Sequence, residues 1–146
     1  MAILKSDNID AESRKVLELI AKHPGSVIAL DTEATGIRVA AGEDTCIGAS
    51  IAAVIGNNAF SHYFPFRHEV GDNIGTETFN LFKKVMEEGE HTFVYVNAQF
   101  DILSLETVGI YLGAENFYDV PTMAHLINEN KPFAKSLEQL SQFYCT

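Results

Sequence analysis

The sequence predicts an α/β domain in which helices flank a mixed β-sheet of three antiparallel strands plus parallel strands. Three observations predict it: apolar residues recur with helical spacing in two segments, a tight turn signal joins a β-branched run to a partly alternating one, and a further apolar run follows the second helical segment. A chain of 146 residues with 47% hydrophobic content can form one sizeable core. We therefore expect residues 1–146 to form a single domain.

The first half of the chain predicts one helix and the antiparallel strands. Helical periodicity covers residues 9–22 and ends before His23-Pro24-Gly25, and the apolar run at 27–30 predicts the first strand. Residues 47–55 and 59–66 are separated by Gly56-Asn57-Asn58, a strong turn signal. A hairpin is expected here, so that three antiparallel strands lie side by side.

The second half predicts a crossover to a parallel strand and then further helices. A helix over residues 76–88, capped by Thr76, should lead to a strand over 92–96 that runs parallel to the first strand. The remaining expected features are a helix over 97–108 capped by Asn97, a helix over 121–127 with Pro121 in its first turn, a break at Lys131-Pro132, and a final helix that Ser136 caps and the chain end cuts short. This order is a ribonuclease H-like layout.

Two acids stand at the end of the first predicted strand. Successive strand residues point to opposite faces, so Asp31 and Glu33 share one face while Thr32 points to the other. Two like charges at this spacing repel each other unless a cation or a donor lies between them. The alternative interpretation is a solvated strand end. Gly36 then allows the chain to turn away.

A second polar group follows the strand predicted over 92–96. Asn97 and Asp101 are four residues apart, which places them on one face at the first turn of a helix. If the two strands are neighbours, Asp101 joins Asp31 and Glu33 near the carboxyl ends of the strands, where open α/β sheets bind ligands. Three carboxylates at such a place suit hard divalent cations.

The two motifs together resemble a known family. Asp-x-Glu followed by Asn-x-x-x-Asp is similar to the first two motifs of the DEDD 3′-5′ exonucleases, in particular the proofreading domain of DNA polymerase I-like (family A) polymerases. The resemblance runs from about Val27 to the end of the chain. It also covers the segments Ile47-Gly48-Ala49-Ser50-Ile51-Ala52, His62-Tyr63-Phe64-Pro65-Phe66-Arg67-His68, Tyr118-Asp119-Val120-Pro121-Thr122-Met123-Ala124-His125-Leu126 and Ser136-Leu137-Glu138-Gln139-Leu140.

The resemblance implies a reaction and a set of site residues. Asp31, Glu33 and Asp101 would be the catalytic residues and would bind two divalent cations, Mg²⁺ or Mn²⁺, for hydrolysis of the terminal phosphodiester bond at a single-stranded DNA 3′ end. Residues expected to bind the terminal nucleotide or support the site are Thr32, Thr35, Asn97 and Phe100. Phe100 could instead be a core residue of its helix, which is the favoured interpretation. No role is assigned to the histidines.

The chain also departs from the family pattern. Ala34 stands where the family usually has Thr, and the third motif, Tyr-x-x-x-Asp or His-x-x-x-x-Asp, is not found in the sequence. Asp119 matches a structural Asp between the second and third motifs. Two alternatives remain: a 3′-5′ exonuclease domain, C-terminally truncated or part of a DNA polymerase, or a catalytically incomplete module with a binding or structural role.

The net charge of −10 counts against simple nucleic-acid binding, because phosphate contacts normally come from basic side chains. Bound divalent ions, and a basic DNA polymerase domain or subunit as a partner, would supply the missing positive charge. No membrane-spanning run or signal peptide is visible, so we expect a cytoplasmic protein. Cys46 and Cys145 are interpreted as ordinary thiols. The pattern does not separate DNA from RNA and indicates no oligomeric state.

Overall fold

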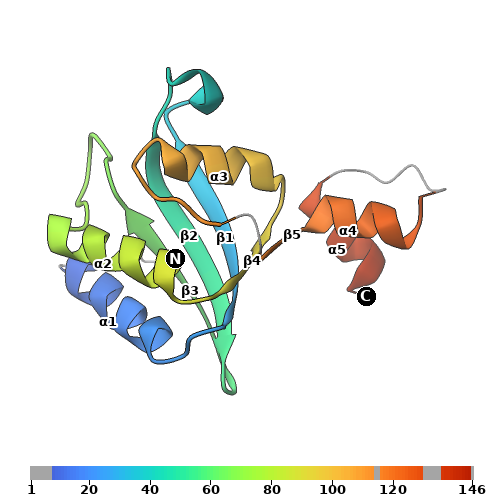
Figure 1. Cartoon of the computed structure of the whole chain (residues 1–146), viewed down its shortest axis with the longest axis horizontal. Helices are drawn as coiled ribbons and strands as arrows, with labels where there is room; N and C mark the ends of the chain where they lie inside the picture. The colour runs from blue at the N-terminus through green and yellow to red at the C-terminus, as the bar shows by residue number, and fades with distance from the viewer. Residues whose placement is uncertain (1–7, 114–115, 130–135, 146) are drawn as a thin grey trace, which may run out of the picture.

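A computed structural model of the chain describes residues 8–113, 116–129 and 136–145 (Figure 1). Five strands form one sheet and are connected by helices. In chain order the elements are α1 (Ile9–Ala21), β1 (Val27–Ala34), the short 3₁₀ helix η1 (Val39–Ala41), β2 (Cys46–Ile55), β3 (Asn58–Pro65), α2 (Thr76–Glu88), β4 (Thr92–Tyr95), α3 (Ala98–Glu106), β5 (Phe117–Asp119), α4 (Val120–Ile127) and α5 (Leu137–Tyr144).

The sheet has the strand order β3-β2-β1-β4-β5. β1 pairs antiparallel with β2, and β2 pairs antiparallel with β3, whereas β4 runs parallel to both β1 and β5. The predicted mixed sheet is therefore confirmed. β5 was not predicted, because a strand of three residues is too short to show an alternating pattern.

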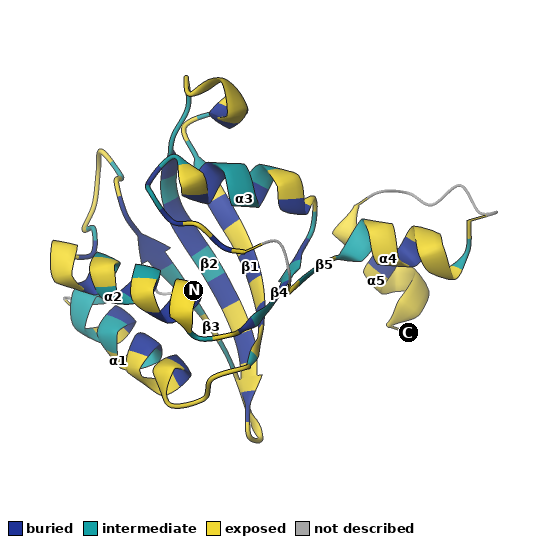
Figure 2. Ribbon diagram, in the orientation of Figure 1, coloured by how far each residue is buried: buried dark blue, intermediate teal, exposed yellow. Residues whose placement is uncertain are grey.

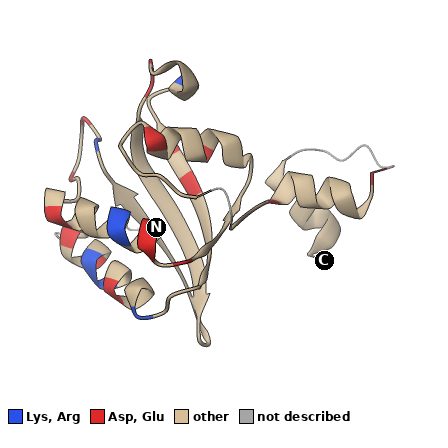
Figure 3. Ribbon diagram, viewed as in Figure 1, with Lys and Arg blue, Asp and Glu red and all other residues tan. Residues whose placement is uncertain are grey.

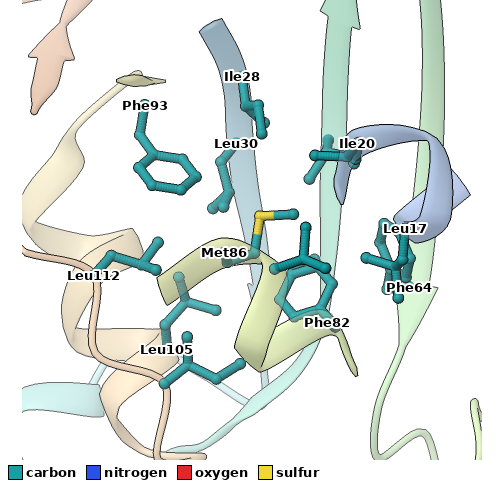
Figure 4. Close-up of a cluster of buried hydrophobic side chains, with 14 of the residues drawn as sticks. Leu17, Ile20, Ile28, Leu30, Phe64, Phe82, Met86, Phe93, Leu105 and Leu112 are labelled. Atoms are coloured by element: carbon teal, nitrogen blue, oxygen red, sulfur yellow. The ribbon is translucent and has the colours of Figure 1, made fainter. Parts of the chain in front are cut away.

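The core lies between one face of the sheet and the helices α1, α2 and α3 (Figure 1). Met86 of α2 lies at its centre, between side chains from the sheet and from the other helices (Figure 4). The labelled members of this cluster are Leu17, Ile20, Ile28, Leu30, Phe64, Phe82, Met86, Phe93, Leu105 and Leu112. Each such side chain contributes roughly 1.5–3 kcal/mol when it is fully removed from water, so this face of the sheet is the main source of stability.

The opposite face of the sheet is open. Buried and exposed residues alternate along β1 (Figure 2), with Ile28, Leu30 and Thr32 buried. The residues between them belong to the open face, where Val27 is 59% exposed and Val54 of β2 is 66% exposed. None of the helices that the structure describes covers these side chains. Because Asp31 and Glu33 belong to the same alternating set, both acids are accessible.

Of the predicted caps, Thr76 is wrong, and Asn97 is confirmed in its position but not in its capping bond. Gly75 occupies the N-cap position of α2, and its N–H donates to Asp10 Oδ1 at 2.7 Å, so a side chain from α1 fixes the start of this helix instead of Thr76. Asn97 is at the N-cap of α3, but its left-handed backbone (φ 67°) leaves its side chain without a capping bond. The Ser136 cap is confirmed by a hydrogen bond from Gln139 N–H at 3.3 Å.

The C-terminal helices lie beside β5, away from the main core (Figure 1). Pro121 is in the first turn of α4, as predicted. Lys131-Pro132, where a break was expected, lies outside the described residues. Both cysteines are free thiols, Cys46 buried and Cys145 exposed. Across the described ranges, no helix is long and apolar enough to cross a membrane.

Candidate active site

The acids of β1 are positioned by strand pairing. Asp31 lies opposite Ser50 of β2, and Glu33 lies opposite Gly48. The register shifts between Glu33 and Ala34, so the regular ladder ends directly after the second acid. As predicted, Asp31 and Glu33 share the exposed face while Thr32 is buried.

Asp101 of α3 is joined directly to β1. Its Oδ1 accepts hydrogen bonds from the Thr32 N–H at 2.8 Å and from the Thr32 hydroxyl at 2.7 Å. β4 pairs with β1 only as far as Ala29, so the Thr32 N–H lies beyond the ladder and needs another acceptor. A hydrogen bond to a charged acceptor contributes about 1.5–3 kcal/mol. The Asp101 carboxylate is therefore fixed at the residue that separates Asp31 from Glu33.

Burial controls the charge of this carboxyl group. Asp101 is only 2% exposed, and burial raises its pKa to about 6 although the Thr32 bonds oppose the shift. The negative charge of Asp31 acts in the same direction as burial. Tyr95 of β4 is also buried nearby, where burial and the charge of Asp101 raise the pKa of its hydroxyl. Within the described part of the chain, the Tyr95 hydroxyl has no hydrogen-bond partner.

The chemistry of these carboxyl groups fits a divalent cation. Their arrangement, however, does not bring three possible ligands together. Carboxylate oxygens are the ligands that Mg²⁺ and Mn²⁺ prefer, and a cation would oppose the upward pKa shift of Asp101. Among the residues that the structure describes, however, no group of three or more His, Cys, Asp and Glu is placed to hold a metal ion. The assignment of Asp31, Glu33 and Asp101 as metal ligands thus stays a prediction.

Thr35 organises the loop that follows β1. Its hydroxyl donates to Asp44 Oδ1 at 3.1 Å and accepts from the Thr45 N–H at 3.0 Å. A Cβ at Gly36 would lie 2.6 Å from Asp44 Oδ2, so a close approach of this carboxylate, rather than a special φ angle, requires glycine there. The hydroxyl of Thr35 is therefore already occupied within the loop, and its predicted contact with a nucleotide stays untested.

The start of α3 depends on a residue from the next strand. The Ala98 N–H donates to Asp119 Oδ2 at 2.7 Å, and Asp119 Oδ1 also accepts from the Thr122 N–H at 3.3 Å. Asp119 thereby caps both α3 and α4, which agrees with a structural role. Phe100 is half-buried and is not among the described hydrophobic side chains packed against the core cluster, so the structure does not favour its interpretation as a core residue.

The sequence analysis assigned no role to Tyr63 and His68, which lie near the acids of β1. The register Asp31–Ser50–Tyr63 places Tyr63 on the same face as the acids, two strands away. Its hydroxyl and His68 Nε2 are 2.5 Å apart. The alternating pattern of residues 59–66, combined with the hairpin register, was the signal that could have identified Tyr63.

Charges are distributed unevenly around the site. β1 and α3 carry acidic but no basic residues, whereas most basic residues in this view are on α1 and α2 (Figure 3). Arg67 lies just beyond the end of β3, and it is exposed. Of the ion pairs between described residues, none involves Arg67, whereas Arg14, Arg38 and Lys83 are all paired. Arg67 is thus a cation available near this end of the sheet.

Comparison with solved structures identifies the fold. The chain is similar to a nuclease in its apo form (14% identity, TM-score 0.60), with 88% of this chain and 56% of that chain covered. It is also similar to Brucella melitensis NrnC with bound Mg²⁺ (12% identity, TM-score 0.59, 83% and 54% covered) and to Brucella melitensis NrnC bound to pGG (13% identity, TM-score 0.55, 84% and 54% covered). The chain thus spans little more than half the length of these nucleases, and the likeness confirms a ribonuclease H-like fold.

No curated protein matches the chain. Residues 7–146 match the model of the 3′-5′ exonuclease family, which is nearly the whole chain. The motif acids, their position on β1 and α3, and the ribonuclease H-like sheet agree with this match. The chain therefore belongs to the 3′-5′ exonuclease family.

Proposed function

We propose that this chain acts as a 3′-5′ exonuclease domain on the 3′ end of single-stranded DNA, with Asp31, Glu33 and Asp101 as its catalytic carboxylates. The observation that carries the proposal is the pair of hydrogen bonds between Thr32 and Asp101. They fix the acid of α3 at the residue between the two acids of β1, although 70 positions separate Asp31 from Asp101 in the numbering (101 minus 31). Family membership makes hydrolysis of nucleic acid the chemistry to test first.

The proposed site needs two divalent cations, Mg²⁺ or Mn²⁺. When bound, they would activate water and stabilise the leaving oxygen. Thr32 orients the Asp101 carboxylate, and the exposed Asp31 and Glu33 present their oxygens on the open face of the sheet. The Thr35 hydroxyl supports the loop after the acids, the exposed Asn97 at the start of α3 is left to contact the substrate, and half-buried Phe100 can pack against the terminal nucleotide. A basic DNA polymerase domain or subunit would complement the acidic charge of this chain.

A second candidate function is a binding or structural module without catalysis. One observation favours it: the acids within the described ranges do not form a group of three that could hold a metal ion. On this reading the fold is retained, and metal binding is weak or absent.

The first experiment measures shortening of a 5′-labelled single-stranded DNA oligonucleotide by the purified chain in Mn²⁺, beside an RNA oligonucleotide of the same sequence. The exonuclease proposal expects stepwise loss from the 3′ end of DNA, with the rate reduced at least about a hundredfold in Asp31→Asn and Asp101→Asn. Glu18→Gln, which changes an exposed acid on α1, is the matched control and should retain the wild-type rate.

Three outcomes separate the candidates. Shortening that survives both Asn variants would show that these acids are not the site. No shortening, together with no Mn²⁺ binding by calorimetry, would support the non-catalytic module. Faster shortening of RNA than of DNA would replace DNA as the proposed substrate.

A further inference from the structure

Tyr63 lies in the same row of the sheet as the first acid of the site. Asp31 pairs with Ser50 across β1 and β2, and Ser50 pairs with Tyr63 across β2 and β3. Directly opposite residues of an antiparallel pair project from the same face. The Tyr63 side chain therefore projects from the open face that carries the acids.

The Tyr63 ring reaches toward the row of the second acid. Gly48 lies opposite Glu33, and a Cβ at Gly48 would overlap the Tyr63 hydroxyl. The ring thus lies over the glycine with its hydroxyl next to the position of Glu33. The Tyr63 pKa is raised first by burial and then by the charge of Glu33, which agrees with this proximity.

His68 fixes the direction of this hydroxyl. Tyr63 Oη and His68 Nε2 are 2.5 Å apart, and the two rings meet edge to face with centroids 5.7 Å apart. The backbone of His68 is itself held by Asn73, whose Oδ1 accepts from the His68 N–H at 2.8 Å and whose Nδ2 donates to the His68 carbonyl at 2.9 Å. The hydroxyl is therefore held in one place before any ligand arrives.

We propose that the Tyr63 hydroxyl, held by His68, binds a non-bridging phosphate oxygen of the 3′-terminal nucleotide; this inference rests on the proposed exonuclease function. A phosphate in this place would lie beside Asp31 and Glu33, and a hydrogen-bond donor on its other side would bind one of its oxygens. When His68 donates its Nε2–H to the tyrosine oxygen, the phenolic O–H is left to donate to the phosphate. The exposed Arg67, directly before His68, adds positive charge at this end of the sheet.

A purely structural role of Tyr63 explains why an aromatic ring lies over Gly48, but it does not explain why this ring carries a hydroxyl. Aromatic rings often cover glycines in sheets, and Tyr63 over Gly48 fits that pattern. Phenylalanine would cover Gly48 equally well. The hydroxyl, in contrast, is bonded to a half-buried histidine beside two acids on an accessible face. Tyr63→Phe therefore separates the two roles.

The test compares kcat and KM of Tyr63→Phe with those of the wild type on the 5′-labelled DNA oligonucleotide in Mn²⁺. Loss of one hydrogen bond to a charged phosphate should raise KM about tenfold with kcat nearly unchanged. His68→Leu should raise KM similarly, while His68→Gln, which keeps an N–H donor, should restore most of the affinity. The matched control is Tyr118→Phe, because Tyr118 of β5 belongs to the same open face and is 54% exposed. Urea unfolding midpoints of all variants should equal the wild-type value.

A wild-type KM for Tyr63→Phe in a protein that shortens DNA would overturn this inference and leave the proposed function intact. A raised KM accompanied by an equally large loss of stability would assign Tyr63 a structural role only. If the wild type neither shortens the oligonucleotide nor binds it in Mn²⁺ by fluorescence anisotropy, the proposed function fails, and the phosphate contact fails with it.

Discussion

Replacing Asp101 by asparagine should stabilise the metal-free protein and at the same time remove its activity. Burial raises the pKa of Asp101 from its ordinary value of 3.8 to about 6. At about 1.36 kcal/mol per unit, keeping this group ionised at pH 7.5 costs up to roughly 3 kcal/mol of folding free energy. Asparagine has the same shape and no charge, and its carbonyl oxygen can accept both bonds from Thr32.

The direction of the pH dependence follows from the sign of the shift. An acid with a raised pKa favours folding in its protonated form, so the contribution of Asp101 to the stability of the wild type is lost as the pH rises from about 4 to about 6. Asp101→Asn does not lose this stability, because asparagine does not ionise. The difference in unfolding free energy between the two proteins should thus be small at pH 4 and reach up to about 3 kcal/mol at pH 7.5.

The assay is urea unfolding in EDTA at several pH values, followed by circular dichroism. Addition of Mn²⁺ should raise the unfolding midpoint of the wild type more than that of Asp101→Asn, because a ligand that binds only the folded state stabilises it. An Asn variant that is less stable than the wild type at pH 7.5 in EDTA would refute the reasoning. Such a result would mean that the hydrogen bonds outweigh the cost of burying the charge.

Two further predictions concern the scaffold. Asp119→Ala should lower the unfolding free energy measured in urea by about 1–2 kcal/mol, because one carboxylate caps both α3 and α4. The control is Asp72→Ala, which changes an exposed acid. Equal unfolding midpoints for Asp119→Ala and the wild type would contradict the capping role. His91 is buried, and burial lowers its pKa, so neutral His91 should add stability above about pH 6.5 that is lost as the pH falls. His91→Gln should therefore lose less stability than the wild type between pH 7.5 and 5.5, whereas exposed His125→Gln should follow the wild type.

Local patterns made most of the sheet and the main helices predictable. The helix of residues 76–88 and the hairpin at 56–58 are encoded by periodicity and turn residues within a few positions of each other. The caps failed because their partners come from elsewhere in the chain: Asp10 of α1 fixes Gly75, and Asp119 fixes the start of α3. A local sequence window cannot contain such partners.

The candidate site, like the fold, was predictable where it depends on local pattern and not where it depends on distant partners. The shared face of Asp31 and Glu33 follows from the two-residue period of a strand, and the structure confirms it. Asp101 was expected beside them, but its bonds go to Thr32, which points to the opposite face. The reason is the short pairing of β4 with β1, which leaves the Thr32 N–H without a strand partner. The periodicity of the sequence does not indicate at which residue the pairing of two strands ends.

The burial of Asp101 says more about function than the exposed pair on β1 does. Exposed acids at a strand end cost little to keep, so Asp31 and Glu33 alone would be compatible with a solvated edge. Asp101 is different, because its ionised form is disfavoured in a place where asparagine could accept the same two bonds. An ionisable group kept at a cost in stability, next to two accessible carboxylates, is the pattern expected where charge is used for ligand binding or catalysis. The stability of Asp101→Asn in EDTA therefore measures the cost at which the wild type keeps this charge.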